Sequence, residues 1–193
     1  LGAFLTHASP PDSAVVARLA AALALDPRTA LAGLAAADVV HTDPASGGIT
    51  VAYPFSGRPT PHRVALAGGS NVHAMCALDA LGIPQMTRRD ARISSTDPTS
   101  GQQIAVEVND GAWCFDPATT VVLVGAAASG DACGAVADCC CPYITFHTDP
   151  QAAEGYRTAH PGMVAELFDQ GEALEAAKRV FGSLLDPSNP QQR

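Results

Sequence analysis

The sequence lacks several features that define familiar protein classes. No apolar run reaches the roughly 20 residues of a membrane-spanning helix, because Arg18 interrupts the alanine-rich stretch 14–25. Basic residues are few, with 11 lysines and arginines against 19 aspartates and glutamates, and the formal net charge is −8. This balance argues against a nucleic-acid partner. Charged residues make up only 16% and hydrophobic residues 47%, so the composition excludes disorder and predicts a buried core.

The first residues also lack a basic segment followed by a long apolar one, which a secretory signal would have. We therefore expect a cytoplasmic protein with no membrane partner, in which the cysteines stay reduced. The spacing of zinc sites is missing as well, because such sites place two or more residues between paired cysteines. The six cysteines instead stand at 76, 114, 133, 139, 140 and 141. Reduced thiols of this kind are core residues, nucleophiles or ligands of soft metals.

The order of predicted elements indicates an α+β fold in two parts. Residues 1–62 predict a winged-helix-like N-terminal module, with helices over 13–24 and 27–37 and then a hairpin made by VVHTD and ITVAYPF. The charges of residues 1–66 balance to zero, so we interpret the module as structural rather than DNA-reading. Residues 63–193 predict a thiol-bearing α+β domain, an antiparallel sheet flanked by helices.

Within the second part, the pattern predicts a helix over 70–82, which Gly82 ends and Pro84 prevents from continuing. The later elements that we expect are a hairpin over 91–108, a strand with AWCF, a buried central strand with TTVVLVG, a loop over 126–138, a strand with PYITFH, and helices over 150–158 and 163–181.

Cys76 and Asp79 are three residues apart on the predicted helix, so a thiol and a carboxylate share one face. Alone, this pair also fits a core cysteine beside a solvated aspartate. The apolar residues around it indicate a buried helix, where a carboxylate requires a partner. On an extended segment Cys139 and Cys141 would face one way and Cys140 the other. A thiolate pair from two segments suits a soft cation, Hg(II), Cu(I) or an organomercurial, better than zinc.

Three segments resemble the organomercurial lyases, also called alkylmercury lyases: MCALDALGIP (75–84), ARISSTDPTSG (91–101) and CPYITFH (141–147). The earlier AYPFS and PTPH are similar to N-terminal regions of bacterial members, so the resemblance covers most of the chain. It implies an enzyme that cleaves the carbon–mercury bond by protonolysis and yields a hydrocarbon and Hg(II).

The resemblance implies Cys76 as the first thiol, Asp79 as the proton carrier and Cys141 as the second thiol, with Cys140 as its rival. It implies that these cysteines hold the Hg(II) product and that no organic cofactor is needed. The implied partners are a small organomercurial substrate and a mercuric reductase or other thiol acceptor of Hg(II).

One departure from the family pattern lies in the hairpin. The family carries an additional cysteine after the paired serines, whereas Ser94 and Ser95 are followed here by Thr96 and Asp97. We interpret that cysteine as structural. The extra thiols of Cys133, Cys139 and Cys140 either receive Hg²⁺ from the site or are incidental.

Two other functions stay open at this point: a non-catalytic soft-metal binder or metallochaperone on the same fold, and a metal-sensing transcription regulator. The remaining residues with chemical potential are interpreted first as packing or surface groups. They are Cys114 as a core residue, Trp113 and Tyr143 as packing or as the wall of a pocket for the organic group, and His62, His73 and His147.

Overall fold

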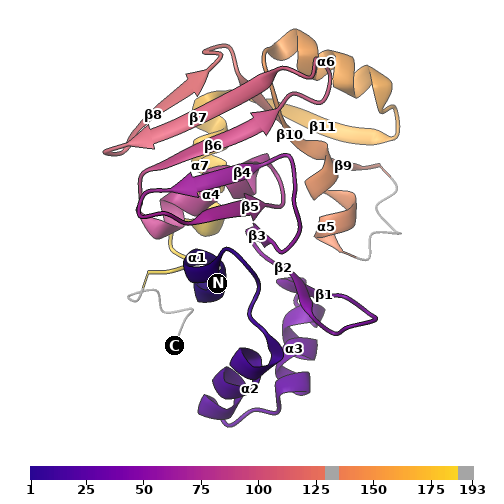
Figure 1. Cartoon of the computed structure of the whole chain (residues 1–193). Coiled ribbons are helices and arrows are strands. Elements are labelled where there is room, and N and C mark those ends of the chain that lie inside the picture. Colours follow the sequence, from indigo (N-terminus) through magenta and orange to yellow (C-terminus); the bar gives the residue numbers. More distant parts are fainter. Residues whose placement is uncertain (129–134, 187–193) are drawn as a thin grey trace.

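The computed structural model describes residues 1–128 and 135–186, which form two antiparallel sheets with helices packed around them (Figure 1). The larger sheet has eight strands in the order β1-β2-β3-β5-β4-β6-β7-β8, and the smaller has three in the order β10-β9-β11. The strands are β1 (Val40–Thr42), β2 (Ile49–Ala52), β3 (Phe55–Ser56), β4 (Arg63–Leu66), β5 (Asn71–Ala74), β6 (Ala91–Thr96), β7 (Gln103–Asn109), β8 (Ala112–Asp116), β9 (Val121–Ala127), β10 (Ile144–His147) and β11 (Met163–Phe168). The predicted α+β class is confirmed.

The helices cover the sheets and extend the N-terminal end of the molecule. Helices α4 and α7 pack against each other behind the larger sheet, and α6 lies over the smaller one (Figure 1). The helices are α1 (Gly2–His7), α2 (Ser13–Ala22), α3 (Pro27–Ala36), α4 (Ala77–Thr87), α5 (Val136–Cys139), the short 3-10 helix η2 (Cys141–Tyr143), α6 (Pro150–Ala159) and α7 (Gln170–Phe181). The core lies between the larger sheet and α4 and α7, and includes Phe55, Leu81 and Ile93.

The two predicted N-terminal helices and the hairpin are present, and the hairpin continues into the larger sheet. Strand β1 pairs with β2, and β2 joins β5 through β3, where Phe55 lies opposite Ala74. The winged-helix detail and the division at residue 62 stay predictions. Among the described residues no single helix is long and apolar enough to cross a membrane, and α2 and α3, bent by 94°, pass that test only as a pair.

Three predicted elements are wrong, the first two because these segments pair with distant strands. Residues 71–74 form β5 rather than a helix, because β3 and β4 bond this segment from both sides. Residues 163–168 form β11 rather than a helix, because they pair with β9 along their whole length. Helix α7 therefore begins only at Gln170, after a capping box between Asp169 and Glu172. In the predicted loop over 126–138, residues 126 and 127 belong to β9 and pair with β11, and residues 136–138 belong to α5.

Gly82 does not end its helix, because α4 continues past it and past Pro84 to Thr87. The glycine instead allows close approach of α7, since a Cβ at Gly82 would overlap the ring of Phe181. Packing against α7 thus outweighs the local helix-breaking tendency of Pro84.

We expect Gly82→Ala to lower the free energy of unfolding by about 1–3 kcal/mol, because the added methyl group forces Phe181 away. Urea unfolding followed by circular dichroism measures this. The matched control is Gly33→Ala in α3, where a Cβ meets nothing within 4 Å, and where alanine stabilises a helix by roughly 0.5–1 kcal/mol. Equal stability of the two variants would contradict the packing argument.

Candidate active site

Cys76, Asp79 and Cys141 come together in the interior. Cys76 lies between β5 and α4, Asp79 lies in the first turn of α4, and Cys141 begins η2 just before β10. The two Sγ atoms and a carboxylate oxygen of Asp79 all lie within 4.8 Å of one another. Strand β10 packs against α4, and this contact brings the two cysteine segments together.

The start of α4 places the first two groups. The backbone of Cys76 is extended, and its Sγ accepts the N–H of Asp79 at 3.4 Å, so the thiol caps the helix. Its carbonyl accepts the N–H of Ala80 at 2.9 Å. Asp79 is thereby fixed in the first turn, where the helix dipole favours a negative group. The spacing of three residues gives this arrangement locally.

The cluster is almost closed to solvent. Cys76 is 3% exposed, and Asp79 and Cys141 are each 4% exposed. Within the described structure the Oδ2 atom of Asp79 has no hydrogen-bond partner. A buried polar atom without a partner is rare and costly. The site therefore retains an unsatisfied acceptor beside two sulfur atoms.

Burial sets the protonation of the cluster. It raises the pKa of Asp79 to about 7, although hydrogen bonds from Cys76 act in the opposite direction. Burial also raises the pKa of the Cys76 thiol well above its usual range, and the Cys141 hydrogen bond and the Asp79 charge add to this effect. The site can thus accept and return one proton near neutral pH while offering two sulfur ligands.

Tyr53 reaches the cluster from the N-terminal segment. Its segment AYPFS (52–56) carried part of the family resemblance, but no role was predicted for Tyr53. The Cys141 thiol donates to the Tyr53 hydroxyl at 3.9 Å. The ring of His41 meets the Tyr53 ring edge-on, with centroids 5.6 Å apart. Burial, with the nearby Cys141 next in effect, raises the pKa of Tyr53, so its hydroxyl keeps its proton. Only the fold brings residue 53 to residue 141.

Cys140 lies outside the cluster that the described residues form. It is half-buried, and its Sγ lies 3.9 Å from that of Cys139. Burial raises the pKa of Cys140, and the neighbouring Cys141 and Asp38 contribute in the same direction. The geometry brings Cys141, not Cys140, to Cys76 and Asp79.

Two expectations about the other cysteines are wrong. Cys139 is disulfide-bonded, so not every cysteine is reduced. Cys114 is exposed rather than in the core, because it lies on the outward side of the edge strand β8 while its neighbour Phe115 faces inward. The prediction for Cys133 lies outside the described residues.

The aromatic and histidine candidates lie away from the thiols or make structural contacts. Trp113 lines a surface groove with Arg88, at the far end of α4 from Cys76. Tyr143 packs edge-on against His160. Two further histidines bond backbone or hydroxyl groups, His73 at Thr60 and His62 at Ser95.

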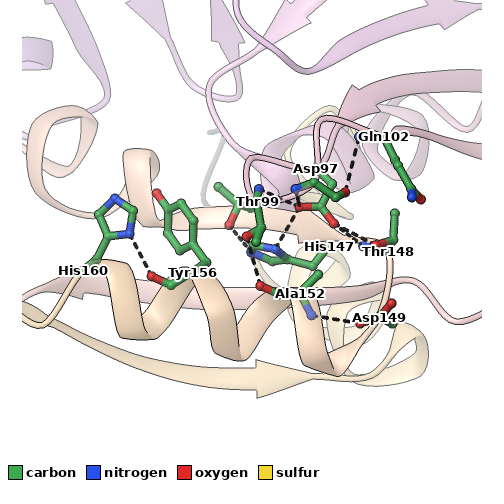
Figure 2. Close-up of polar contacts among 11 residues, drawn as sticks. Asp97, Thr99, Gln102, His147, Thr148, Asp149, Ala152, Tyr156 and His160 are labelled. Carbon is green, nitrogen blue, oxygen red and sulfur yellow. Dashed lines mark hydrogen bonds and ion pairs between the residues drawn. The ribbon is translucent and has the colours of Figure 1, made fainter.

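Asp97 joins the β6–β7 hairpin to the segment that follows β10 (Figure 2). Its Oδ2 atom accepts the backbone N–H of Thr148 at 2.9 Å and the hydroxyl of Thr148 at 2.8 Å. The buried ring of His147 lies 3.5 Å from the other carboxylate oxygen. Burial would raise the pKa of Asp97, but hydrogen bonds from Thr148, Thr99 and Ser100 outweigh it and lower the value to about 2. These contacts hold the hairpin against β10, which η2 and Cys141 precede.

Comparison with known proteins identifies the family. Residues 55–182 match the family model of MerB, the alkylmercury lyases. The chain belongs to the alkylmercury lyase family. The match includes Cys76, Asp79 and Cys141, and it begins after Tyr53.

Similar members of the alkylmercury lyase family come from several bacteria. The alkylmercury lyase of Staphylococcus epidermidis is 30% identical over 140 residues, which are 70% of this chain and 63% of that protein. The Bacillus cereus alkylmercury lyase is 29% identical over 133 residues, 68% of this chain and 58% of its own length. The matched region thus spans about three fifths of these relatives. A crystal structure of the mercury-bound form of MerB2 shares the fold, with a TM-score of 0.73, 22% identity, and coverage of 89% of this chain and 82% of that one.

Proposed function

We propose that this chain is an organomercurial lyase, which cleaves a carbon–mercury bond by protonolysis to give a hydrocarbon and Hg(II). The observation that carries the proposal is the buried cluster of Cys76, Asp79 and Cys141, with its three donor atoms within 4.8 Å. Membership of the alkylmercury lyase family supports the substrate class.

The two thiols act in succession on mercury. The Cys76 sulfur replaces the counter-ion of R–Hg–X and forms a sulfur–mercury bond, and the thiol proton leaves with the counter-ion as H–X. Cys141 then adds its sulfur to the same mercury atom, and its proton passes to the Asp79 carboxylate. Soft sulfur donors suit mercury, and each added thiolate pushes electron density onto the bound carbon.

Asp79 completes the cleavage. Its neutral carboxyl group donates the proton to the carbon atom while the carbon–mercury bond breaks. The products are R–H, Hg(II) held by the two sulfur atoms, and Asp79 again as carboxylate. The raised pKa of Asp79, about 7, supports both halves of this transfer near neutral pH.

The proposal includes no organic cofactor, because the sulfur and carboxyl groups supply every step. Two buried thiolates hold the Hg(II) product, so turnover requires a thiol that displaces them. A mercuric reductase or a small thiol would serve as that acceptor.

The test is incubation of the reduced protein with a phenylmercury salt and excess thiol, with benzene measured by gas chromatography. The unsubstituted chain is expected to release benzene catalytically, and Cys76→Ser is expected to release none above background. Stoichiometric mercury binding without benzene would instead identify a soft-metal binder, which the same cluster of donors would also serve.

The second thiol is assigned by a pair of neighbouring variants. We expect Cys141→Ser to lower the rate of benzene release at least 10²-fold, because serine cannot replace sulfur on mercury. Cys140→Ser, which changes a half-buried thiol outside the cluster, is expected to stay within about threefold of the unsubstituted chain. The reverse order of effects would transfer the role to Cys140.

A further inference from the structure

The N-terminal segment contacts the second-thiol segment, residues 135–141, at both of its ends. At the start of α5, the backbone N–H of Val136 donates to the Oδ2 atom of Asp38 at 2.9 Å. At the start of η2, the thiol of Cys141 donates to the hydroxyl of Tyr53 at 3.9 Å. Figure 1 shows α5 beside the end of the sheet where β2 and β3 lie. The two contacts hold the segment at its first turn and at its reactive sulfur.

His41 links these two contacts from the N-terminal side. Its Nε2 atom lies 3.0 Å from the Oδ1 atom of Asp38, and its ring packs edge-on against Tyr53 at an angle of 86°. The carboxylate of Asp38 therefore accepts a hydrogen bond from the backbone of the second-thiol segment and lies beside the imidazole that packs against Tyr53. The family match begins at residue 55, so it includes none of these three residues.

From these contacts we propose that Tyr53 is a positioning residue for the second thiol, Cys141, and that Asp38 holds the segment carrying that thiol in place. The inference rests on the proposed function and adds an N-terminal contribution to the active site. A cysteine side chain has three staggered rotamers. The Tyr53 hydroxyl selects the one that turns the Cys141 sulfur toward Cys76 and Asp79.

A tyrosine hydroxyl suits this position because it both accepts and donates a hydrogen bond. It accepts the S–H group of Cys141 before the reaction and donates to the sulfur once that proton has moved to Asp79. The hydrogen bond thus persists through the step in which Cys141 adds to mercury. Phenylalanine would keep the ring against His41 and lose only the hydroxyl.

The experiment compares Tyr53→Phe with Tyr156→Phe in the benzene assay. The Tyr156 hydroxyl, from α6, donates to the Pro142 carbonyl in η2 at 3.3 Å. This control therefore removes a tyrosine hydroxyl that bonds the turn of Cys141 but does not bond the thiol. We expect Tyr53→Phe to lower kcat about 10-fold and to leave KM within about twofold, because Cys76 still captures the substrate. Tyr156→Phe is expected to stay within about twofold in both constants.

A second readout does not depend on catalysis. The protein is loaded with Hg(II), and a dithiol is added while the ultraviolet absorption of the mercury–thiolate bonds is followed. Tyr53→Phe is expected to lose Hg(II) at about a 10-fold lower dithiol concentration, because its second sulfur is less well placed. If the unsubstituted chain releases no benzene but this difference is found, the proposed function fails and the positioning role stands.

Asp38 is tested with the same two measurements. Asp38→Ala removes the acceptor for the Val136 N–H group. We expect it to lower both kcat and the dithiol concentration that removes Hg(II) by about threefold, less than Tyr53→Phe does. Asp38→Asn keeps an oxygen acceptor there and is expected to recover most of that loss. The proposal is overturned if Tyr53→Phe equals the unsubstituted chain in both readouts. It is also overturned if Tyr156→Phe shows the same losses as Tyr53→Phe.

Discussion

Asp79→Asn is expected to lower the rate of hydrocarbon release by about 10²- to 10⁴-fold, the usual contribution of a positioned proton-transfer group. The amide has nearly the shape of the carboxyl group but cannot accept the Cys141 proton and return it to carbon. Both thiols remain in the variant, so it is expected to bind phenylmercury stoichiometrically. Benzene release by gas chromatography and mercury content of the desalted protein measure the two quantities.

The same carboxyl group predicts a pH dependence for the unsubstituted chain. Because burial raises the pKa of Asp79 to about 7, the group becomes protonated as the pH falls through that value. A protonated Asp79 cannot accept the thiol proton, so kcat/KM is expected to fall as the pH drops below about 7.

The Asp79→Asn variant has its own contradicting outcome. Benzene release by this variant within 10-fold of the unsubstituted chain would remove Asp79 from the proposed mechanism.

Asp79→Asn is also expected to stabilise the folded chain, and most strongly at alkaline pH. In the unfolded chain the Asp79 carboxyl ionises near its ordinary pKa of 3.8, but in the folded chain it ionises only near 7. Below about pH 4 both states are protonated and the full stability is present. Between about pH 4 and 7 ionisation favours the unfolded chain, and the free energy of unfolding falls by roughly 4 kcal/mol. Asparagine does not ionise, so the variant escapes this loss.

Urea unfolding at pH 5 and pH 8 measures the difference between the two proteins. The free energy of unfolding of Asp79→Asn is expected to exceed that of the unsubstituted chain by more at pH 8 than at pH 5. Asp97→Asn is the control of opposite sign. Hydrogen bonds that outweigh the effect of burial lower the pKa of Asp97 to about 2, so ionised Asp97 stabilises the fold above about pH 4. Its replacement is expected to destabilise the protein at pH 8. If the difference in the free energy of unfolding between Asp79→Asn and the unsubstituted chain did not change with pH, the raised pKa of the buried Asp79 carboxyl group would be contradicted.

These two predictions describe opposite effects of one residue on activity and stability. A buried carboxyl group with a free oxygen destabilises the fold when it ionises, and the proposed reaction requires that ionised form. Residues at active sites commonly combine function with a local cost in stability. Asp79 therefore links the proposed function to the stability of the chain.

The sequence alone determined the parts of the molecule that depend on neighbouring residues. The three-residue spacing of Cys76 and Asp79 places a thiol and a carboxylate on one turn, because the side chain of a cap residue reaches the backbone N–H three residues later. Alternating apolar residues predicted the hairpin over 91–108, which the structure confirms as β6 and β7. The segments MCALDALGIP and CPYITFH carried the family resemblance, which the family match confirms.

Tertiary structure decided the features that depend on contacts between distant segments. Strands β5 and β11 form because neighbouring strands bond them, which no local helical pattern reveals. Of the adjacent cysteines, Cys141 reaches Cys76 because it begins η2, with β10 held between β9 and α4, and not because an extended segment alternates its faces. The hydrogen bond from Cys141 to Tyr53 likewise exists only in the folded chain. The sequence thus determined the chemical groups of the site, and packing decided which of them meet.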